Sequence, residues 1–595
     1  MMRAMHKYSL VISSIEDIVF SCLDKIFIRT ARLALQSFMA MVIVLFSIPS
    51  ALSDPIELPT AQGANRNSRL IDISGEIGTY GELYAISGRD RRRPSSAGRI
   101  FFKPTINILQ NFTINFNLFL STEGSSARQD INQIDINPKW GWGEAHLVDF
   151  TESYSSFTLD GVKIRGASLN LTPGIFRASV ISGISQKEVS SSSGQPAYRR
   201  RLNGGKIGIG HDGKSHFDLI IISSRDDILS AEIVLSDSIV NEDSSEHTGN
   251  QNPESITPQE NIVGAIVTGL SIADDRVLWN NEFSGSAITR DRRSSEWEQE
   301  GYPSALKSVF TPRMSSSFDI AFSSDIKFNL GSYNILTNYQ YVGPGYISLG
   351  IAGQSSDRQA IKLSLNRRFN AGAVKLDLSR QNDNLIKQKR FTTNRYTVNA
   401  GATFKPTIIW SFNFNITYMT MNNHATDSSA RVNFANWVFR ANNGLAFERS
   451  IGLTNISLEY SYQTSGDKNS ARTSSNLNSH TTAVRAAFNV REGISMVQSV
   501  NIVGSRQAEA GWAMTHSYST SLNILSLNKR LNSGFQVGIG FDNAATSLKS
   551  GLRSNYKLTP SAAISLQLEL RNVRSDNDSG ALDELTSRLT ITNRF

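Results

Sequence analysis

Residues Gly208 to Ser215, Gly-Ile-Gly-His-Asp-Gly-Lys-Ser, have the residue types and spacing of a phosphate-binding loop. In such a loop the backbone amides and the lysine hold phosphates at the N-terminus of the helix that follows. Here the continuation, Phe217 to Ile222, is rich in isoleucine and predicts a strand instead. Asp212-Gly213 is typical of a hairpin turn. We therefore expect no nucleotide binding.

Two small groups of polar residues could in principle perform acid–base or metal chemistry. In a strand Glu144 and His146 would share a face, whereas Asp149 would not. His211 and His216 flank the predicted turn and could hold a metal across the hairpin. Neither group is accompanied by further residues at metal-ligand spacing, and no Gly-x-Ser-x-Gly motif stands near a histidine. We expect no catalytic, cofactor or metal site, and an enzyme is the least favoured alternative.

The elements that would position these residues have a period of two. From Leu70 onward apolar and polar residues alternate in segments of about ten residues, as at 111–120 and 407–421. Such segments are longer than most globular strands and near the length that a tilted strand needs to cross a bilayer. Lipid cannot satisfy the edge of an open sheet. The pattern therefore predicts an all-β fold, a large antiparallel transmembrane β-barrel of about 22–26 strands.

The segments that we recognise are odd in number, whereas termini on one side of the membrane require an even number. At least one strand is therefore spurious or missing. We expect it between about 381 and 430, where long and short connections do not alternate cleanly. The composition, 39% hydrophobic and 19% charged, suits such a barrel because only alternate residues face lipid. A net charge of +8 over 595 residues does not indicate nucleic-acid binding.

The N-terminal region has the layout of a secretory signal. Arg29 and Arg32 precede an apolar stretch centred on 38–48, and the small-x-small pattern of Ala51-Leu52-Ser53 follows. We predict a signal peptide over 1–53, a short periplasmic segment over 54–69, and the barrel over 70–595. The alternative for the leader is an uncleaved membrane anchor. The single cysteine, Cys22, lies in the leader, so no disulfide is expected in the barrel.

The last segment alternates from Leu585 and ends on Phe595, with Asn593 interrupting its apolar face. It resembles the C-terminal strand of Gram-negative outer-membrane β-barrel proteins. The resemblance implies a location in the outer membrane, insertion by the barrel-assembly machinery, and contact with lipid and lipopolysaccharide. Arginine-rich patches at 89–93, 199–201 and 290–293 either bind lipopolysaccharide phosphates or only keep the loops soluble.

The stretch 131–166 is the least barrel-like. We consider two interpretations, a segment folded into the lumen or a strand that bears interface aromatics followed by a strand bent at glycine. In the first, Trp140, Trp142, Glu144 and His146 are the candidate constriction. The longest aperiodic connections are 187–200, 237–260 and 290–316, which we expect to be loops.

The predicted function is a porin-like channel for passive passage of solutes, because a wide barrel with a polar inner face holds water. The candidate pore-lining residues, all on polar faces of their segments, are Asn115, Asn117, Lys362, Lys375, Arg485 and Glu569. The alternative is the barrel of a protein secretion or surface-assembly system. A TonB-dependent receptor is less favoured. Such receptors resemble one another in carrying a plug domain before the first strand, and only about 16 residues would separate the leader from Leu70.

Overall fold

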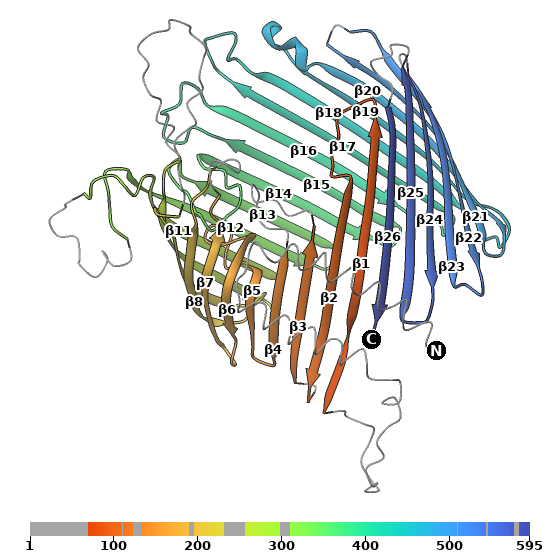
Figure 1. The fold of residues 1–595 in the computed structure, drawn as a ribbon. Helices are drawn as coiled ribbons and strands as arrows, with labels where there is room; N and C mark the ends of the chain where they lie inside the picture. The colour runs from red at the N-terminus through yellow and green to blue at the C-terminus, as the bar shows by residue number, and fades with distance from the viewer. Residues whose placement is uncertain are drawn as a thin grey trace, which may run out of the picture. The chain divides into compact units, whose positions relative to one another are not determined.

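The computed structural model describes residues 70–109, 111–122, 132–189, 196–230, 256–297, 310–508, 510–542, 545–575 and 582–595. The predicted leader 1–53 and the segment 54–69 lie outside these residues. The described chain forms one sheet of 26 strands and one short 3-10 helix, η2 (Ser470–Ser475). Figure 1 shows the strands side by side around the barrel. None of its helices is long and apolar enough to cross a membrane.

The strands of the first half of the barrel are β1 Ile71–Ser87, β2 Ser96–Ile108, β3 Phe112–Ser121, β4 Gln133–Trp140, β5 Gly143–Glu152, β6 Val162–Leu171, β7 Phe176–Gln186, β8 Arg200–Gly210, β9 His216–Asp226, β10 Glu260–Ile272, β11 Val277–Thr289, β12 Ser316–Leu330 and β13 Tyr333–Val342. Those of the second half are β14 Arg358–Phe369, β15 Gly372–Asn382, β16 Thr393–Phe404, β17 Trp410–Asn423, β18 Asn433–Ala446, β19 Gly452–Asp467, β20 Leu477–Arg491, β21 Ile494–Gln507, β22 Ala513–Ser526, β23 Leu531–Phe541, β24 Ala545–Lys557, β25 Ala562–Ser575 and β26 Leu582–Arg594.

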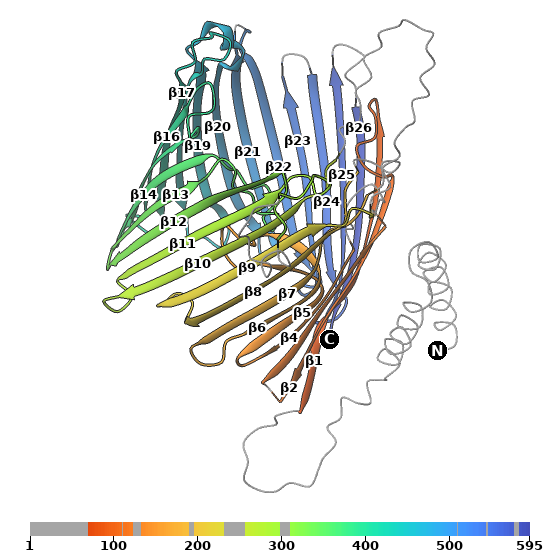
Figure 2. The same ribbon diagram turned by 90° about the vertical axis from the view of Figure 1, so that its left-hand side faces the viewer.

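Each strand pairs antiparallel with the next, and β26 pairs antiparallel with β1, which closes the sheet into a barrel (Figures 1 and 2). The seam includes the C-terminal residue. Gly75 N–H donates to the carbonyl of Phe595 at 2.9 Å, and Phe595 N–H donates back to Gly75 at 3.1 Å. The predicted all-β antiparallel barrel is confirmed, and its 26 strands lie within the predicted range.

The prediction that a strand was wrongly assigned between about 381 and 430 was wrong. Sequence periodicity misses β4 and β5, because Pro138 and the Gly-Trp-Gly stretch at 141–143 interrupt the alternation. It also divides β18 in two, because Asn442-Asn443-Gly444 looks like a turn although it continues the strand. Between 381 and 430 the structure has β16, β17 and their connections as ordinary hairpins.

The connections differ between the two ends of the barrel. Those that follow even-numbered strands are turns of at most five residues, and the long ones all follow odd-numbered strands. Outer-membrane barrels have short periplasmic turns and longer outer loops. Both ends of the barrel chain therefore lie at the end with the short turns.

The alternation of strand residues separates two faces. On β9, Phe217, Leu219 and Ile221 are half-exposed, whereas Ile220 and Ile222 are buried. The exposed apolar face continues around the ring as the outward face, with Phe283, Trp437 and Leu589 among its members. An outward apolar band around a closed antiparallel barrel is what a transmembrane barrel presents to lipid.

Candidate functional site: a barrel lumen narrowed by two inward loops

One wall of the lumen is covered by the connection between β5 and β6, residues 153–161. The chain leaves the wall after Val148, whose φ of +77° is unusual for a β-branched residue. Gly166 lies at the return point, where a Cβ would come 2.0 Å from the carbonyl oxygen of Ser182 on β7. Only glycine permits this close approach, so the hairpin around 153–161 bends inward over the neighbouring strands.

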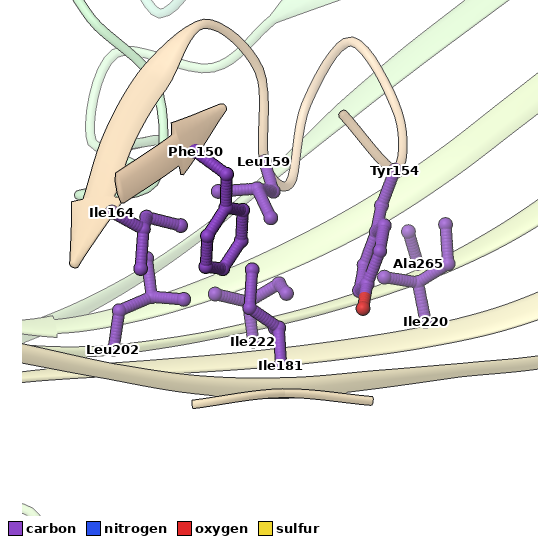
Figure 3. Packing of buried hydrophobic residues seen from close by; sticks show 9 residues of the cluster. All are labelled: Phe150, Tyr154, Leu159, Ile164, Ile181, Leu202, Ile220, Ile222 and Ala265. Carbon is purple, nitrogen blue, oxygen red and sulfur yellow. The ribbon is translucent and has the colours of Figure 1, made fainter. Parts of the chain in front are cut away.

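The inner side of this hairpin packs on the barrel wall. Phe150, Tyr154 and Leu159 form a buried cluster with side chains of five strands, β6 to β10, which Figure 3 shows pointing toward one another. The residues from these strands are Ile164, Ile181, Leu202, Ile220, Ile222 and Ala265. Leu159 is 0% exposed and Phe150 only 3% exposed. The wall therefore has apolar side chains on both faces here, because one faces lipid and the other is covered by the hairpin.

A second inward connection, residues 343–357 between β13 and β14, packs beside the first. Tyr346 and Phe157 form an edge-to-face pair with ring centroids 6.0 Å apart, in a cluster with Val263, Ala321 and Val342. The hydroxyl of Tyr346 donates to the carbonyl of Phe157 at 2.8 Å. Burial raises the pKa of Tyr346 well above its ordinary value, which keeps this donor protonated.

Further hydrogen bonds join the two connections. Ser348 Oγ donates to the carbonyl of Thr158 at 2.6 Å, and Asp160 N–H donates to the carbonyl of Gly350 at 3.0 Å. We call residues 153–161 and 343–357 together the inner loops. Because they share hydrogen bonds and a buried cluster, we expect them to move as one unit.

Polar side chains of the wall hold the inner loops in place. The carboxylate of Glu282 on β11 accepts the N–H groups of Ser156 and Phe157 at 3.2 and 3.0 Å. Asn261 on β10 donates to the carbonyl of Ile347 at 3.0 Å and accepts the N–H of Leu349 at 3.0 Å. Both side chains are buried, so the loop amides and carbonyls supply the partners that a buried polar group requires.

The described residues leave the opposite wall uncovered. Among the described residues, buried side chains concentrate on β5 to β13 and their loops, whereas β22 to β26 contribute only Leu582 and Thr586. A recess of about 1040 Å³ lies along the inner face of β22 to β26. Since β10 and β24 are separated by about half of the 26 strands, the covered and open walls face each other across the lumen.

The pairing register places all six candidate pore-lining residues on the inward face. Asn115 and Asn117 lie on β3, Lys362 on β14, Lys375 on β15, Arg485 on β20 and Glu569 on β25. Lys375 forms an ion pair with Asp377 at 2.9 Å. Glu569 accepts a hydrogen bond from Gln567 at 2.6 Å and lines the open recess. These six residues come from distant parts of the wall and do not form one ring.

The four candidate constriction residues are divided between two faces. Trp140 ends β4 and stacks on Phe112 of the outward face, with centroids 6.2 Å apart, and Trp142 lies in the turn. Neither tryptophan narrows the lumen, so the prediction that Trp140 and Trp142 belong to a constriction is wrong. His146 faces inward beside Asn137, and Glu144 forms an ion pair with Lys139 at 3.3 Å. The inner loops, not the Trp-Gly-Trp stretch, reduce the open area.

The phosphate-loop pattern at 208–215 forms the end of β8 and the turn to β9, with no helix after it. The third residue of the first polar group, Asp149, accepts two hydrogen bonds from Arg165 at 2.8 and 3.0 Å. Across the described residues we find no group of three or more His, Cys, Asp or Glu side chains that could hold a metal ion.

Five of the ten arginines in the three basic patches have an acidic partner; one of them is Arg93, which lies 3.5 Å from Glu82. Arg199 pairs with Glu188 at 2.6 Å and Arg200 with Asp226 at 2.7 Å. Arg292 lies 3.4 Å from Glu260, and Arg293 lies 2.9 Å from Asp291. These pairs leave fewer free cations for lipopolysaccharide phosphates than the sequence suggests.

The first inner loop lies within 131–166, the stretch for which a segment folded into the lumen was one of two interpretations. Sequence reasoning did not indicate the second inner loop, nor the contacts of Phe157, Tyr346 and Glu282. The sequence does contain one signal that part of the inner face is covered. Leu219 to Ile222 is a run of four aliphatic residues in a strand, so both faces of β9 are apolar and the inner face requires a cover. The partner that supplies the cover lies some 60 residues earlier in the chain and is not indicated by the pattern.

No family model matches this chain, and no curated protein matches it in sequence. Among solved structures, the P pilus usher (PapC) translocation pore aligns at 10% identity over 88% of this chain and 99% of that chain, with a TM-score of 0.33. The ferric enterobactin receptor PfeA aligns at 8% identity over 88% and 81%, with a TM-score of 0.40. Pseudomonas aeruginosa OpdK aligns at 9% identity over 57% and 93%, with a TM-score of 0.29. The strand pairing and the two faces of this chain themselves establish that it is a 26-strand transmembrane β-barrel of the outer-membrane type.

Proposed function

We propose that the protein is a water-filled channel of the outer membrane through which solutes diffuse. The observation that carries the proposal is the closed ring of 26 strands with a polar inner face that the described inner loops cover on one side only. With strands about 4.8 Å apart and tilted by about 40°, a circular ring of this size is about 50 Å across between backbones. Loops on one wall narrow such a lumen without filling it.

The proposal includes the expected processing of the chain. Residues 1–53 are removed as a signal peptide, 54–69 remain in the periplasm, and 70–595 are inserted by the barrel-assembly machinery. Lipid and lipopolysaccharide surround the outward face. The apolar outward band and the start of β1 at Ile71 support this division.

Swelling of proteoliposomes in uncharged sugars of increasing size tests the channel. We expect rapid swelling with small sugars and a size limit that rises when residues 154–159 are replaced by a short glycine–serine linker. Vesicles that contain folded barrel and do not swell with any sugar would exclude passive passage.

A second candidate is a barrel that passes or anchors other proteins, which the width of the ring favours. At this width an unobstructed lumen would leak, so barrels of this size are usually plugged. The same swelling assay separates the two functions, since a plugged secretion barrel admits no sugar until its plug is removed.

A further inference from the structure

The open wall of the lumen carries an unbalanced positive charge. In the pairing register Lys549 and Arg553 of β24 face inward beside Arg571 of β25, and all three line the recess of about 1040 Å³. Lys549 and Arg571 are direct partners across the two strands. Like charges at such a position repel each other, so a bound anion would stabilise the pair.

Two other arginines of this wall share one carboxylate. Arg588 Nε lies 2.8 Å from Glu82 Oε2, and Arg93 lies 3.5 Å from the same carboxylate. Two further carboxylates line the recess. Glu569 is the direct cross-strand partner of Gly551, and Glu584 is the direct partner of Arg571 and accepts a hydrogen bond from the hydroxyl of Tyr84 at 2.9 Å. By contrast, within the described chain Lys549, Arg553 and Arg571 make no hydrogen bond or ion pair with an acidic side chain. Among the described residues this wall therefore has more cations than carboxylates and keeps a net positive charge. The six cations are Arg92, Arg93, Lys549, Arg553, Arg571 and Arg588, and the three carboxylates are Glu82, Glu569 and Glu584.

The inward face of β24 between these cations carries no large side chain. Gly551 lies between Lys549 and Arg553 on the inward face of β24, and a Cβ there would meet only the carbonyl oxygen of Leu568, at 3.6 Å. Its direct partner on β25, Glu569, accepts a hydrogen bond from Gln567 at 2.6 Å. The recess thus has space for an anionic group of a ligand between three long basic side chains.

In the described part of the covered wall, the inward cations of β7 to β9 have partners within the protein. Arg177 lies 3.2 Å from Asp218, Arg200 lies 2.7 Å from Asp226, and the ammonium of Lys206 lies over the ring of Tyr154, 5.2 Å from its centroid. The buried carboxylate of Glu282 holds the inner loops. The carboxylate of Asp319 accepts the N–H of Gly345 at 2.6 Å. A solute that enters the open part of the lumen therefore meets the basic wall, which we define as Lys549, Arg553 and Arg571.

We propose that the basic wall makes the channel anion-selective and binds solutes that carry carboxylate or phosphate groups. Guanidinium and ammonium groups recognise both kinds of anion through charge-assisted hydrogen bonds. Water in the lumen screens these contacts, so binding is weak enough to allow release, as conduction requires. This inference rests on the proposed channel function.

Planar-bilayer recordings of the refolded full chain test the inference. In a KCl gradient the wild-type current should reverse toward the chloride equilibrium potential. In the Lys549→Gln/Arg553→Gln/Arg571→Gln variant the reversal potential should move toward zero. Millimolar citrate or tripolyphosphate should block the wild-type current, and the concentration for half block should rise about tenfold in the variant, the order expected for three exposed ion pairs.

The matched control removes three positive charges outside the lumen, in Lys387→Gln/Arg449→Gln/Lys529→Gln, and should leave reversal potential and block unchanged. The single variant Lys549→Gln should give an intermediate shift even if the triple variant folds poorly. A wild-type reversal potential at zero, or equal shifts in the triple variant and its control, would overturn the basic wall while leaving the channel intact. Absence of any conductance from folded protein would instead refute the channel itself.

Discussion

Replacing Phe157 by alanine should release the inner loops from the covered wall. The Phe157 ring is 2% exposed and touches Tyr346 and the wall residues Val263, Ala321 and Val342. Removal of a buried phenylalanine ring costs about 3–5 kcal/mol. Since the inner loops have no covalent link to the wall, most of this cost falls on their docking equilibrium, which should shift by about a hundredfold or more toward the undocked form.

The shift can be measured with a cysteine beneath the ring. Val263 is 0% exposed under the inner loops, so in a Cys22→Ser background the variant Val263→Cys carries one reporter thiol. A water-soluble maleimide should react with it slowly in the otherwise wild-type barrel and at least a hundred times faster once Phe157→Ala is added. Ser521→Cys, in the open recess, gives the rate of a thiol that the inner loops do not protect.

The matched control is Phe283→Ala, which removes a ring of the same size from the outward face, where it is 49% exposed. This change should leave the labelling rate of Val263→Cys within a factor of about two. If Phe157→Ala does not accelerate labelling, or if Phe283→Ala accelerates it as much, the inner loops are not held by the packing described here.

Three further results are expected. Phe595→Ala should lower the free energy of unfolding by about 1–2 kcal/mol in a urea titration, because its ring stacks on Phe102 at 6.1 Å, and Phe595→Tyr should restore most of it. The hydrogen bond and charge of Arg199 lower the pKa of Glu188 to about 2. The ion pair of Glu188 with Arg199 therefore stabilises the fold fully above the unfolded pKa of about 4.3, and this stabilisation is lost as the pH falls through about 2. Pepsin cleavage of the loop 187–199 should increase over this interval, and Glu188→Gln should remove the pH dependence. Amide exchange should be about tenfold faster on β4 and β5 than at the β1–β26 seam, because four residue pairs join β4 to β5 and twelve join β26 to β1; equal rates would contradict this difference.

The architecture could be predicted because lipid imposes it. An outward apolar band and a water-filled interior require alternation in each strand, and this alternation is local in sequence. The strands β3 and β17 are therefore evident from residues 111–120 and 407–421 alone. The same rule fails at β4 and β5, where Pro138 lacks an N–H and the side chain of Asn137 donates instead to the carbonyl of Ala145 at 2.8 Å.

The candidate site could be predicted only in part. Register decides which face a residue occupies, so alternation is sufficient to place Lys362 and Glu569 on the inward side. It does not indicate which inward residues remain uncovered, because that depends on contacts between distant segments. Phe157 and Tyr346 are 189 residues apart and meet only in the closed barrel. The free cations of the basic wall likewise become evident only when the partners of Arg588 and Arg93 are known.

The conductance of single barrels in a planar bilayer tests the central claim most directly. Refolded protein whose unheated and boiled forms migrate differently in a gel should produce steady, stepwise and ohmic conductance without any added partner. Protein that passes the same folding criterion and leaves the bilayer silent at all applied voltages would contradict the account of this barrel as an open, water-filled channel.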